Sequence, residues 1–193
     1  VSIVPPTIKY TDKDLPAPKR DLEKAKQLLK EAGVKLPLKA EIWSNSYKPR
    51  VDLAQIFQAQ LKEVGIEVEA KVLEWGAYLD GLKRGEHDMY IVGWVISSVD
   101  PDGIFSGIVH TNGGSNYSRF FNKEVDALID KGKTMPDGPE REAVYKELQK
   151  LVAEHRPMIF LYNEENFFGV NKSVQNFHPS PRGYHNVTGV TFK

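Results

Sequence analysis

The sequence predicts an α/β fold in which helices cover both faces of a parallel sheet. Segments with strand and helix periodicity alternate between residues 38 and 96, in the order strand, helix, strand, helix, strand. An apolar run of eight residues that begins at Met89 is typical of a strand buried on both sides. Parallel strands joined by right-handed crossovers end at one edge of the sheet, and ligands bind beyond that edge.

The composition fits one globular domain. The chain has 193 residues, 40% hydrophobic and 27% charged, which is enough to bury a core without disulfides or metals. The 26 basic residues balance the 26 acidic ones, so nothing favours a nucleic-acid partner. The absence of cysteine excludes thiol catalysis and disulfides. There is no long apolar stretch and no signal peptide at Val1. The opening residues Val-Ser-Ile-Val-Pro-Pro are unlike a natural start, so we expect a fragment or a processed product.

The elements of the first half follow from local signals. Residues 1–20 carry four prolines, which favour an irregular extended arm. Asp21 is suited to cap a helix with apolar residues at helical spacing, and Gly33 to end it. The elements expected next are a strand over residues 38–43, a helix from about 49 to 64, a strand over 66–73, a helix over 75–84 and the strand from Met89.

The second half predicts helices followed by short strands. A loop rich in glycine and asparagine comes after the third strand. Helices are expected from about 122 to 131 and from 139 to 155, then strands over 158–162 and 166–170. The last twenty residues have the composition of an irregular segment.

Short motifs along the chain resemble, in their order, a known family. They are Val4-Pro5-Pro6, the helix over 23–33, residues 61–68, Trp75 and Tyr78, Gly93-Trp94, Asp100-Pro101, Asn116, Phe121-Asn122, Val125-Asp126, Leu128-Ile129, Arg141, Tyr145 and Pro157. None is diagnostic alone. The ordered set, over roughly residues 1–177, resembles the second lobe of the extracytoplasmic solute-binding proteins of ABC importers, family 5, which includes oligopeptide-, dipeptide- and nickel-binding proteins.

The resemblance implies a lobe of the periplasmic-binding-protein type II-like fold, a mixed sheet with a parallel βαβαβ core and flanking helices. Residues 1–20 would be a Pro-rich arm, and residues 21–193 the C-terminal lobe of a two-lobed clamp whose N-terminal lobe is absent. The implied function is capture of an oligopeptide or oligosaccharide by lobe closure and delivery to the membrane permease of an ABC importer. The full-length protein would be periplasmic, or extracellular and membrane-anchored. One lobe alone would bind the solute weakly, because it offers only part of the contact.

Four candidate ligand-binding residues lie near the ends of the predicted strands. Trp94 is suited to stack against a sugar ring or a peptide group, or to serve as a core tryptophan. Trp43 falls at the end of the first strand. Asn45 and Tyr47 follow in a polar loop that suits hydrogen bonding to a solute and also suits an ordinary turn.

The other four candidates come later in the chain. The resemblance implies that Ser97 stands where peptide-binding members commonly have an aspartate that pairs with the peptide amino group. A neutral hydroxyl cannot make that charge-assisted bond, so the amine contact does not carry over. Asp100 could bind a cationic or hydroxylated solute or start a turn. Asn116 and Arg119 lie in the Gly-rich loop, where an arginine could hold a carboxylate or lie in solvent.

Catalysis, cofactors and metals are not predicted. The five histidines show no metal-ligand spacing, and no set of nucleophile, base and orienting residue is present. Two alternatives to transport remain open. One is a sensory or regulatory module in which solute binding alters a partner, and the other is a hydrolase built on a similar sheet.

Overall fold

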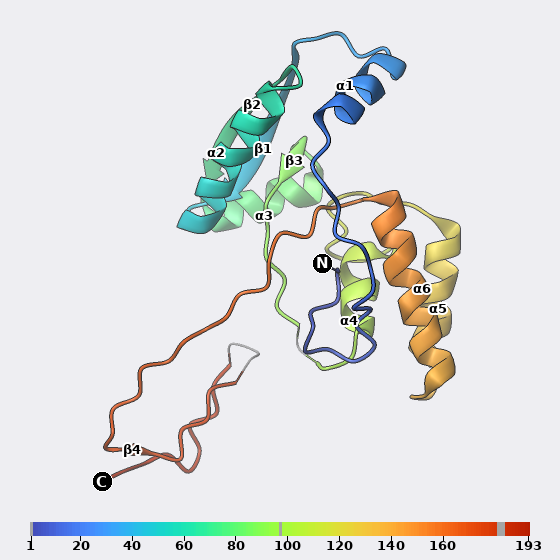
Figure 1. Ribbon diagram of the computed structural model, residues 1–193. Helices are drawn as coiled ribbons and strands as arrows, with labels where there is room; N and C mark the ends of the chain where they lie inside the picture. Colours follow the sequence, from blue (N-terminus) through green and yellow to red (C-terminus); the bar gives the residue numbers. More distant parts are fainter. Residues whose placement is uncertain (1, 97, 181–183) are drawn as a thin grey trace. The chain divides into compact units, whose positions relative to one another are not determined.

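The computed structural model describes residues 2–96, 98–180 and 184–193 (Figure 1). The chain divides into two compact units. The sheet unit consists of residues 18–94, and the helical unit combines the segment up to residue 17 with residues 95–193. The arm therefore groups in part with the second half of the chain. The predicted division into an arm of residues 1–20 and a lobe of 21–193 stays a prediction.

The sheet unit has the predicted parallel βαβαβ order. Its three strands lie in the order β2-β1-β3, and β1 pairs in parallel with both neighbours. The register with β2 runs from Leu38 opposite Ile66 to Asn45 opposite Leu73. The elements are α1 (Leu22–Glu31), β1 (Leu38–Asn45), α2 (Lys48–Lys62), β2 (Ile66–Leu73), α3 (Trp75–Arg84) and β3 (Met89–Tyr90).

Helices α2 and α3 cover opposite faces of this sheet (Figure 1). Ala54 of α2 is buried in one apolar cluster with Ile42 of β1. Gly81 of α3 lies directly against the ring of Trp43. Because Ile42 and Trp43 are consecutive in β1, their side chains point to opposite faces. The predicted covering of both faces is therefore confirmed.

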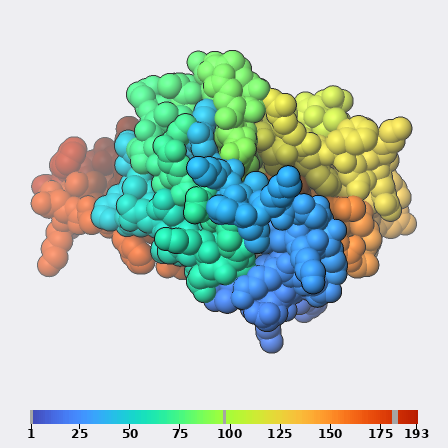
Figure 2. Space-filling view, turned by 90° about the horizontal axis from the view of Figure 1, so that it is seen from above, coloured from blue at the N-terminus to red at the C-terminus, as the bar shows by residue number. Residues whose placement is uncertain are grey.

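Two of the predicted helix ends are confirmed by their capping contacts, and α5 (Lys123–Thr134) runs three residues beyond its expected end, to Thr134. The Asp21 carboxylate accepts a hydrogen bond from the Lys24 backbone N–H at 2.8 Å and so begins α1. Gly85 ends α3 in the left-handed conformation, with φ of 71°. Helix α1 buries none of its side chains and belongs to the blue part of the surface in Figure 2.

The prediction of a long third strand is wrong. Strand β3 contains only Met89 and Tyr90, and the chain beyond it turns away with Val95 68% exposed. The register sets a limit to this pairing. Tyr90 pairs with Trp43, and the Ile91 N–H still donates to the Trp43 carbonyl at 2.9 Å. Because β1 ends at Asn45, the run from Gly93 onward has no β1 residue opposite it.

The helical unit is built on two long helices, α5 and α6. Its elements are α4 (Asp102–Ile104), the π-helical turn η1 (Phe105–Val109), α5 (Lys123–Thr134), α6 (Pro139–His155), β4 (Val174–Gln175) and β5 (Thr191–Phe192). Val4 of the arm is buried in its core with Phe105, Ile129 and Tyr145. Both long helices were predicted, whereas α4 and η1 replace part of the expected loop. No helix among the described residues is long and apolar enough to cross a membrane.

The two strands predicted after α6 do not form. Residues 158–162 and 166–170 have no strand assignment, and side chains such as Ile159 and Phe167 are 70% and 89% exposed. Their apolar, β-branched and aromatic composition has strand propensity, but strands form only against a neighbour. In the part of the chain that the structure describes, the only ladder after α6 is the short antiparallel pair of β4 and β5.

We expect Gly81→Ala to destabilise the sheet unit by about 1–3 kcal/mol, because a new methyl group would overlap the Trp43 ring. Urea denaturation followed by tryptophan fluorescence measures this, since all three tryptophans lie between residues 43 and 94. Gly103→Ala is the control, because nothing lies within 4 Å of the added atom. Equal midpoints for the two variants would contradict the packing described.

Candidate functional site

The sheet unit places three chain segments at one edge. Because β1, β2 and β3 are parallel, the residues that follow each strand emerge on the same side. These are the turn after Asn45, the start of α3 at Trp75 and the segment from Ile91 to Trp94. We call the side where these three segments emerge the carboxyl edge. It is the part of the sheet unit where the sequence predicts a ligand.

An arginine that the sequence analysis did not single out connects two of these segments. Arg50, in the first turn of α2, donates a hydrogen bond from Nη1 to the Asn45 side-chain oxygen at 3.0 Å. Its guanidinium carbon lies 5.4 Å from the centre of the Tyr47 ring. A Cβ atom at Gly93 would lie 2.7 Å from Arg50 Nη2, so the guanidinium is in direct contact with this glycine. The helical spacing of Arg50 from Ala54 was the signal that could have found it.

The three tryptophans have different environments. Trp94 is 45% exposed and directly follows Gly93, so it presents aromatic surface beside the edge. Trp75 is 46% exposed, and its ring lies 5.8 Å from that of Tyr78. Trp43 is only 8% exposed, and its Nε1 donates to Glu41 Oε2 at 2.9 Å. The Trp43 ring is therefore enclosed by the sheet unit and offers little surface to a solute.

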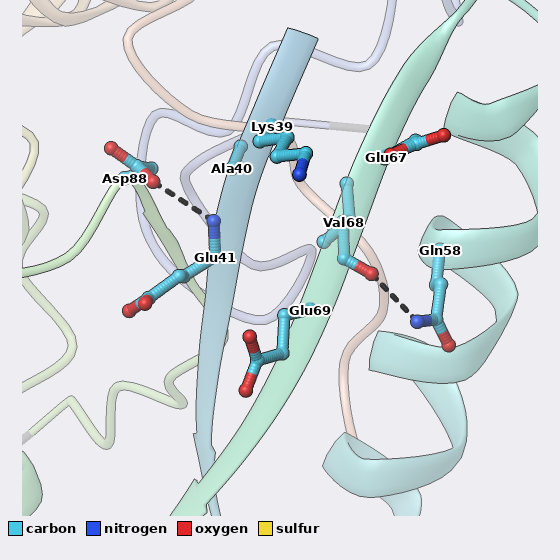
Figure 3. A pocket seen from close by; sticks show the side chains of 8 residues that line it. All are labelled: Lys39, Ala40, Glu41, Gln58, Glu67, Val68, Glu69 and Asp88. Atoms are coloured by element: carbon cyan, nitrogen blue, oxygen red, sulfur yellow. Dashed lines mark hydrogen bonds between the residues drawn. The ribbon is translucent and has the colours of Figure 1, made fainter. Parts of the chain in front are cut away.

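A separate open hollow lies nearer the amino ends of β1 and β2 (Figure 3). It is lined by Lys39, Ala40, Glu41, Gln58, Glu67, Val68, Glu69 and Asp88. Some of its polar groups already have partners. The Asp88 carboxylate accepts from the Glu41 backbone N–H at 2.8 Å, and Gln58 Nε2 donates to the Val68 carbonyl at 2.6 Å. It lacks the aromatic wall typical of a solute pocket, so we assign it no binding role.

Asp100 lies in the helical unit and has a buried partner. Arg141 of α6, 5% exposed, donates to both Asp100 carboxylate oxygens at 2.6 and 3.0 Å. The same guanidinium donates to the Gly132 carbonyl at 2.8 Å and to Asp137 at 3.0 Å. The hydrogen bonds from Arg141 hold the pKa of Asp100 below its usual value. This geometry favours a structural role for Asp100 over contact with a solute.

The arm completes this network through Asp137. Lys9 Nζ and the Tyr10 hydroxyl donate to the two oxygens of Asp137 at 2.6 and 2.8 Å. Together they hold the pKa of Asp137 at about 2. The Tyr10 and Tyr145 rings stack at 5.9 Å, and the Arg141 guanidinium lies 4.9 Å from the Tyr145 ring. One buried cation thus connects the arm, the turn at Asp100 and α6.

The remaining candidates are divided between the units. The Asn116 side chain donates to the His110 and Phe120 carbonyls at 3.2 and 2.8 Å, which commits it to a loop. Arg119 is exposed, in a left-handed conformation with φ of 54°. Ser97 lies outside the described residues. The structure brings together Asn45, Tyr47 and Gly93-Trp94 within the sheet unit, whereas Asp100, Asn116 and Arg119 belong to the helical unit.

The described residues contain no group of three or more histidine, aspartate or glutamate side chains placed to hold a metal ion. The site at the carboxyl edge consists of amide, phenol, indole and guanidinium groups. Such groups bind a solute by hydrogen bonds, ion pairing and stacking.

Known proteins are similar to this chain in sequence and in fold. A family model described as "Bacterial extracellular solute-binding proteins, family 5 Middle" matches residues 1–116. The dipeptide-binding protein of Escherichia coli is 30% identical over 200 residues, which cover 100% of this chain and 37% of that protein. The chain therefore spans well under half the length of this curated relative.

Two solved structures are similar to this chain. The oligopeptide-binding protein AppA from Bacillus subtilis, in complex with a nonapeptide, has a TM-score of 0.86 and 25% identity, over 100% of this chain and 42% of that chain. The periplasmic binding protein DppA from Helicobacter pylori, in complex with the peptide STSA, has a TM-score of 0.77 and 33% identity, over 81% of this chain and 31% of that chain. The predicted α/β lobe of the periplasmic-binding-protein type is thus confirmed.

We expect Asp100→Asn to lower the free energy of unfolding at pH 7 by about 2 kcal/mol, because it leaves Arg141 buried with a weaker partner. The folded-state pKa of Asp100 is lowered, so its stabilisation is complete above the unfolded pKa of about 3.9 and is lost as pH falls through the folded value. The gap between wild type and variant should therefore shrink below about pH 4. Urea denaturation followed by circular dichroism at pH 7 and pH 3 measures it.

The control for this experiment is Asp80→Asn, which removes an exposed carboxylate that pairs with Lys83 at 3.6 Å. Its effect should stay within about 0.5 kcal/mol at pH 7. A gap between wild type and Asp100→Asn that is as large at pH 3 as at pH 7 would show that the carboxylate charge is not what stabilises the unit.

Proposed function

Because the chain belongs to the bacterial extracellular solute-binding proteins of family 5, we propose that it forms part of a protein that captures peptides for uptake by an ABC importer. The similar proteins from Escherichia coli, Bacillus subtilis and Helicobacter pylori are described as dipeptide-binding, as oligopeptide-binding and as bound to a peptide. These likenesses favour a peptide over an oligosaccharide, for which the same three proteins give no support. Family membership also confirms the expectation of a non-enzymatic binding protein.

The proposal places the protein outside the cytoplasm, in the periplasm or attached to the outer face of the membrane. Its partners would be the peptide, a second lobe that closes over it and the membrane permease of the importer. A sensory or regulatory module, the alternative to transport, would bind the same peptide. Within the described part of the chain, no contact favours this alternative over transport.

The observation that carries the proposal is the carboxyl edge of the sheet unit. There Trp94 and Tyr47 offer aromatic surface, and Asn45 offers amide groups, beside the backbone of Gly93. Aromatic walls with a few fixed polar groups suit a peptide, which presents alternating amides and side chains. We propose Asn45, Tyr47 and Trp94 as solute contacts. Ser97 and Arg119 also stay proposed solute contacts.

The direct test is mass spectrometry of small molecules that co-purify with the full-length protein carrying this chain. Recovery of peptides supports the proposal, and recovery of sugars alone contradicts it. Calorimetry with the recovered peptide then tests Trp94→Ala, for which we expect a loss of affinity of about tenfold to a hundredfold through lost stacking. Phe121→Ala is the control, because Phe121 is a 64% exposed aromatic side chain of the helical unit.

We expect Ser97→Asp to increase the preference for solutes with a free amino group. A carboxylate at this position would supply the charge-assisted hydrogen bond that a serine hydroxyl cannot make to an ammonium group. Calorimetry with a peptide and its amino-acetylated form measures the preference, and Ser97→Asn, which adds the same bulk without the charge, is the control. Equal discrimination by wild type and Ser97→Asp would count against a solute contact at residue 97.

A further inference from the structure

The chain that leaves the sheet unit runs for several residues without backbone hydrogen bonds. The ladder of the sheet ends where the Ile91 N–H donates to the Trp43 carbonyl. The next backbone hydrogen bond joins the Lys9 N–H to the Val99 carbonyl at 3.2 Å. Residues 92–96 and 98, as far as the structure describes them, form none in between. We call residues 92–98 the connecting span, and it contains Trp94, a proposed solute contact.

Few packing contacts hold the connecting span. Val95 is 68% exposed and Trp94 is 45% exposed. Ile96 is half-buried and packs against the core of the helical unit. A segment with few buried contacts and no backbone ladder has little stability of its own. Its course therefore depends on the groups that hold its two ends.

Asp100 anchors the far end of the connecting span through its side chain. Its two carboxylate oxygens accept hydrogen bonds from Arg141 at 2.6 and 3.0 Å. The Asp100 N–H donates to Ser98 Oγ at 3.3 Å, and Ser98 is the last residue of the span. A bidentate pair between arginine and carboxylate fixes direction as well as distance. The guanidinium thus fixes the turn that begins at Ser98.

Arg141 is a fixed point because several groups hold its guanidinium. Its Nε donates to the Gly132 carbonyl at 2.8 Å, and its Nη1 donates to Asp137 at 3.0 Å. The Tyr10 and Tyr145 ring centres lie 5.7 and 4.9 Å from the guanidinium carbon. A buried planar fork held in this way imposes its own position on the carboxylate that it binds.

We propose that Arg141 is a positioning residue for solute binding. Arg141 holds Asp100, Asp100 holds the end of the connecting span, and the span carries Trp94. If this anchor is loosened, the span samples more conformations, and binding must then order it at a cost in conformational entropy. The inference rests on the proposed function, and it adds a determinant of affinity in the core of the helical unit, at a residue that does not contact the solute.

The test measures binding of tri-alanine to the full-length protein carrying this chain by calorimetry. Arg141→Lys keeps the charge but loses the planar fork, so we expect the affinity to fall roughly threefold to thirtyfold. Asp100→Asn, which replaces one acceptor oxygen by an NH₂ donor, should lower the affinity in the same direction. Urea denaturation of each variant shows whether it folds.

The matched control is Gln149→Leu. Gln149 is also buried, about two turns further along α6. It exchanges hydrogen bonds with Ser2, Asp12, Tyr10 and Tyr145, and with no described residue of the connecting span. Gln149→Leu should therefore lower the urea midpoint, because it removes buried hydrogen bonds, and leave the affinity for tri-alanine unchanged.

A double-mutant cycle separates positioning from a general loss of stability. Trp94→Ala removes the aromatic contact that the connecting span presents, so Arg141→Lys should reduce the affinity less in the Trp94→Ala background than in wild type. A smaller fraction of folded protein would act equally in both backgrounds. If Arg141→Lys does not fold, Asp100→Asn takes its place in the cycle.

Three results would overturn the inference and leave peptide capture intact. They are an unchanged affinity in the folded variant, effects that simply add in the cycle, and an equal loss of affinity in Gln149→Leu. Failure of wild type to bind tri-alanine, together with no co-purified peptide, would overturn the proposed function itself.

Discussion

Parallel pairing of β1 with both of its neighbours is the constraint on which the sheet unit depends. It brings the ends of three strands to one edge, and the alternation along β1 fixes which helix covers which face. Ile42 faces α2 and Trp43 faces α3, so a slip of one residue would turn the Trp43 indole toward α2 and the smaller Ile42 side chain toward α3. The position of Asn45 at the edge, and with it the partner of Arg50, follows from this register.

The helical unit is organised by a different kind of interaction. A buried guanidinium must be matched by acceptors, because an unpaired charge in a core is costly. Arg141 meets this requirement with Asp100, Asp137 and the Gly132 carbonyl, which come from a turn, a loop and α5. Tyr10 of the arm stacks on Tyr145 beside it. Segments that are distant in the sequence are thereby held around the Arg141 guanidinium. Asp100 has a structural role in this network because both of its carboxylate oxygens accept hydrogen bonds from Arg141.

Local signals made the helices and the first two strands predictable, whereas non-local contacts decided the rest. Strand β2 and helices α3 and α6 have the expected limits, because caps such as Glu74 and Gly85 act within one turn. The apolar run after Met89 predicts a longer strand, but β1 ends at Asn45 and leaves the run from Gly93 onward without a residue opposite it. The sequence alone does not decide between a solute contact and a turn for Asp100, because its partner Arg141 is 41 residues away. Arg50 was missed because a charge beside an apolar stripe resembles a solvated residue, and its contact with Gly93 is not visible in the sequence.

The hydrogen bond from Gln58 to Val68 helps to protect the free edge of β2 against aggregation. Strand β2 is eight residues long and has β1 on one side only, so its other side offers backbone groups to any extended chain. The Gln58 amide occupies one of these carbonyls, and Glu67, Glu69 and Lys71 add charge along the strand. Replacing Gln58 and these three charged residues with apolar ones would leave an unprotected strand edge that could pair with other chains and aggregate.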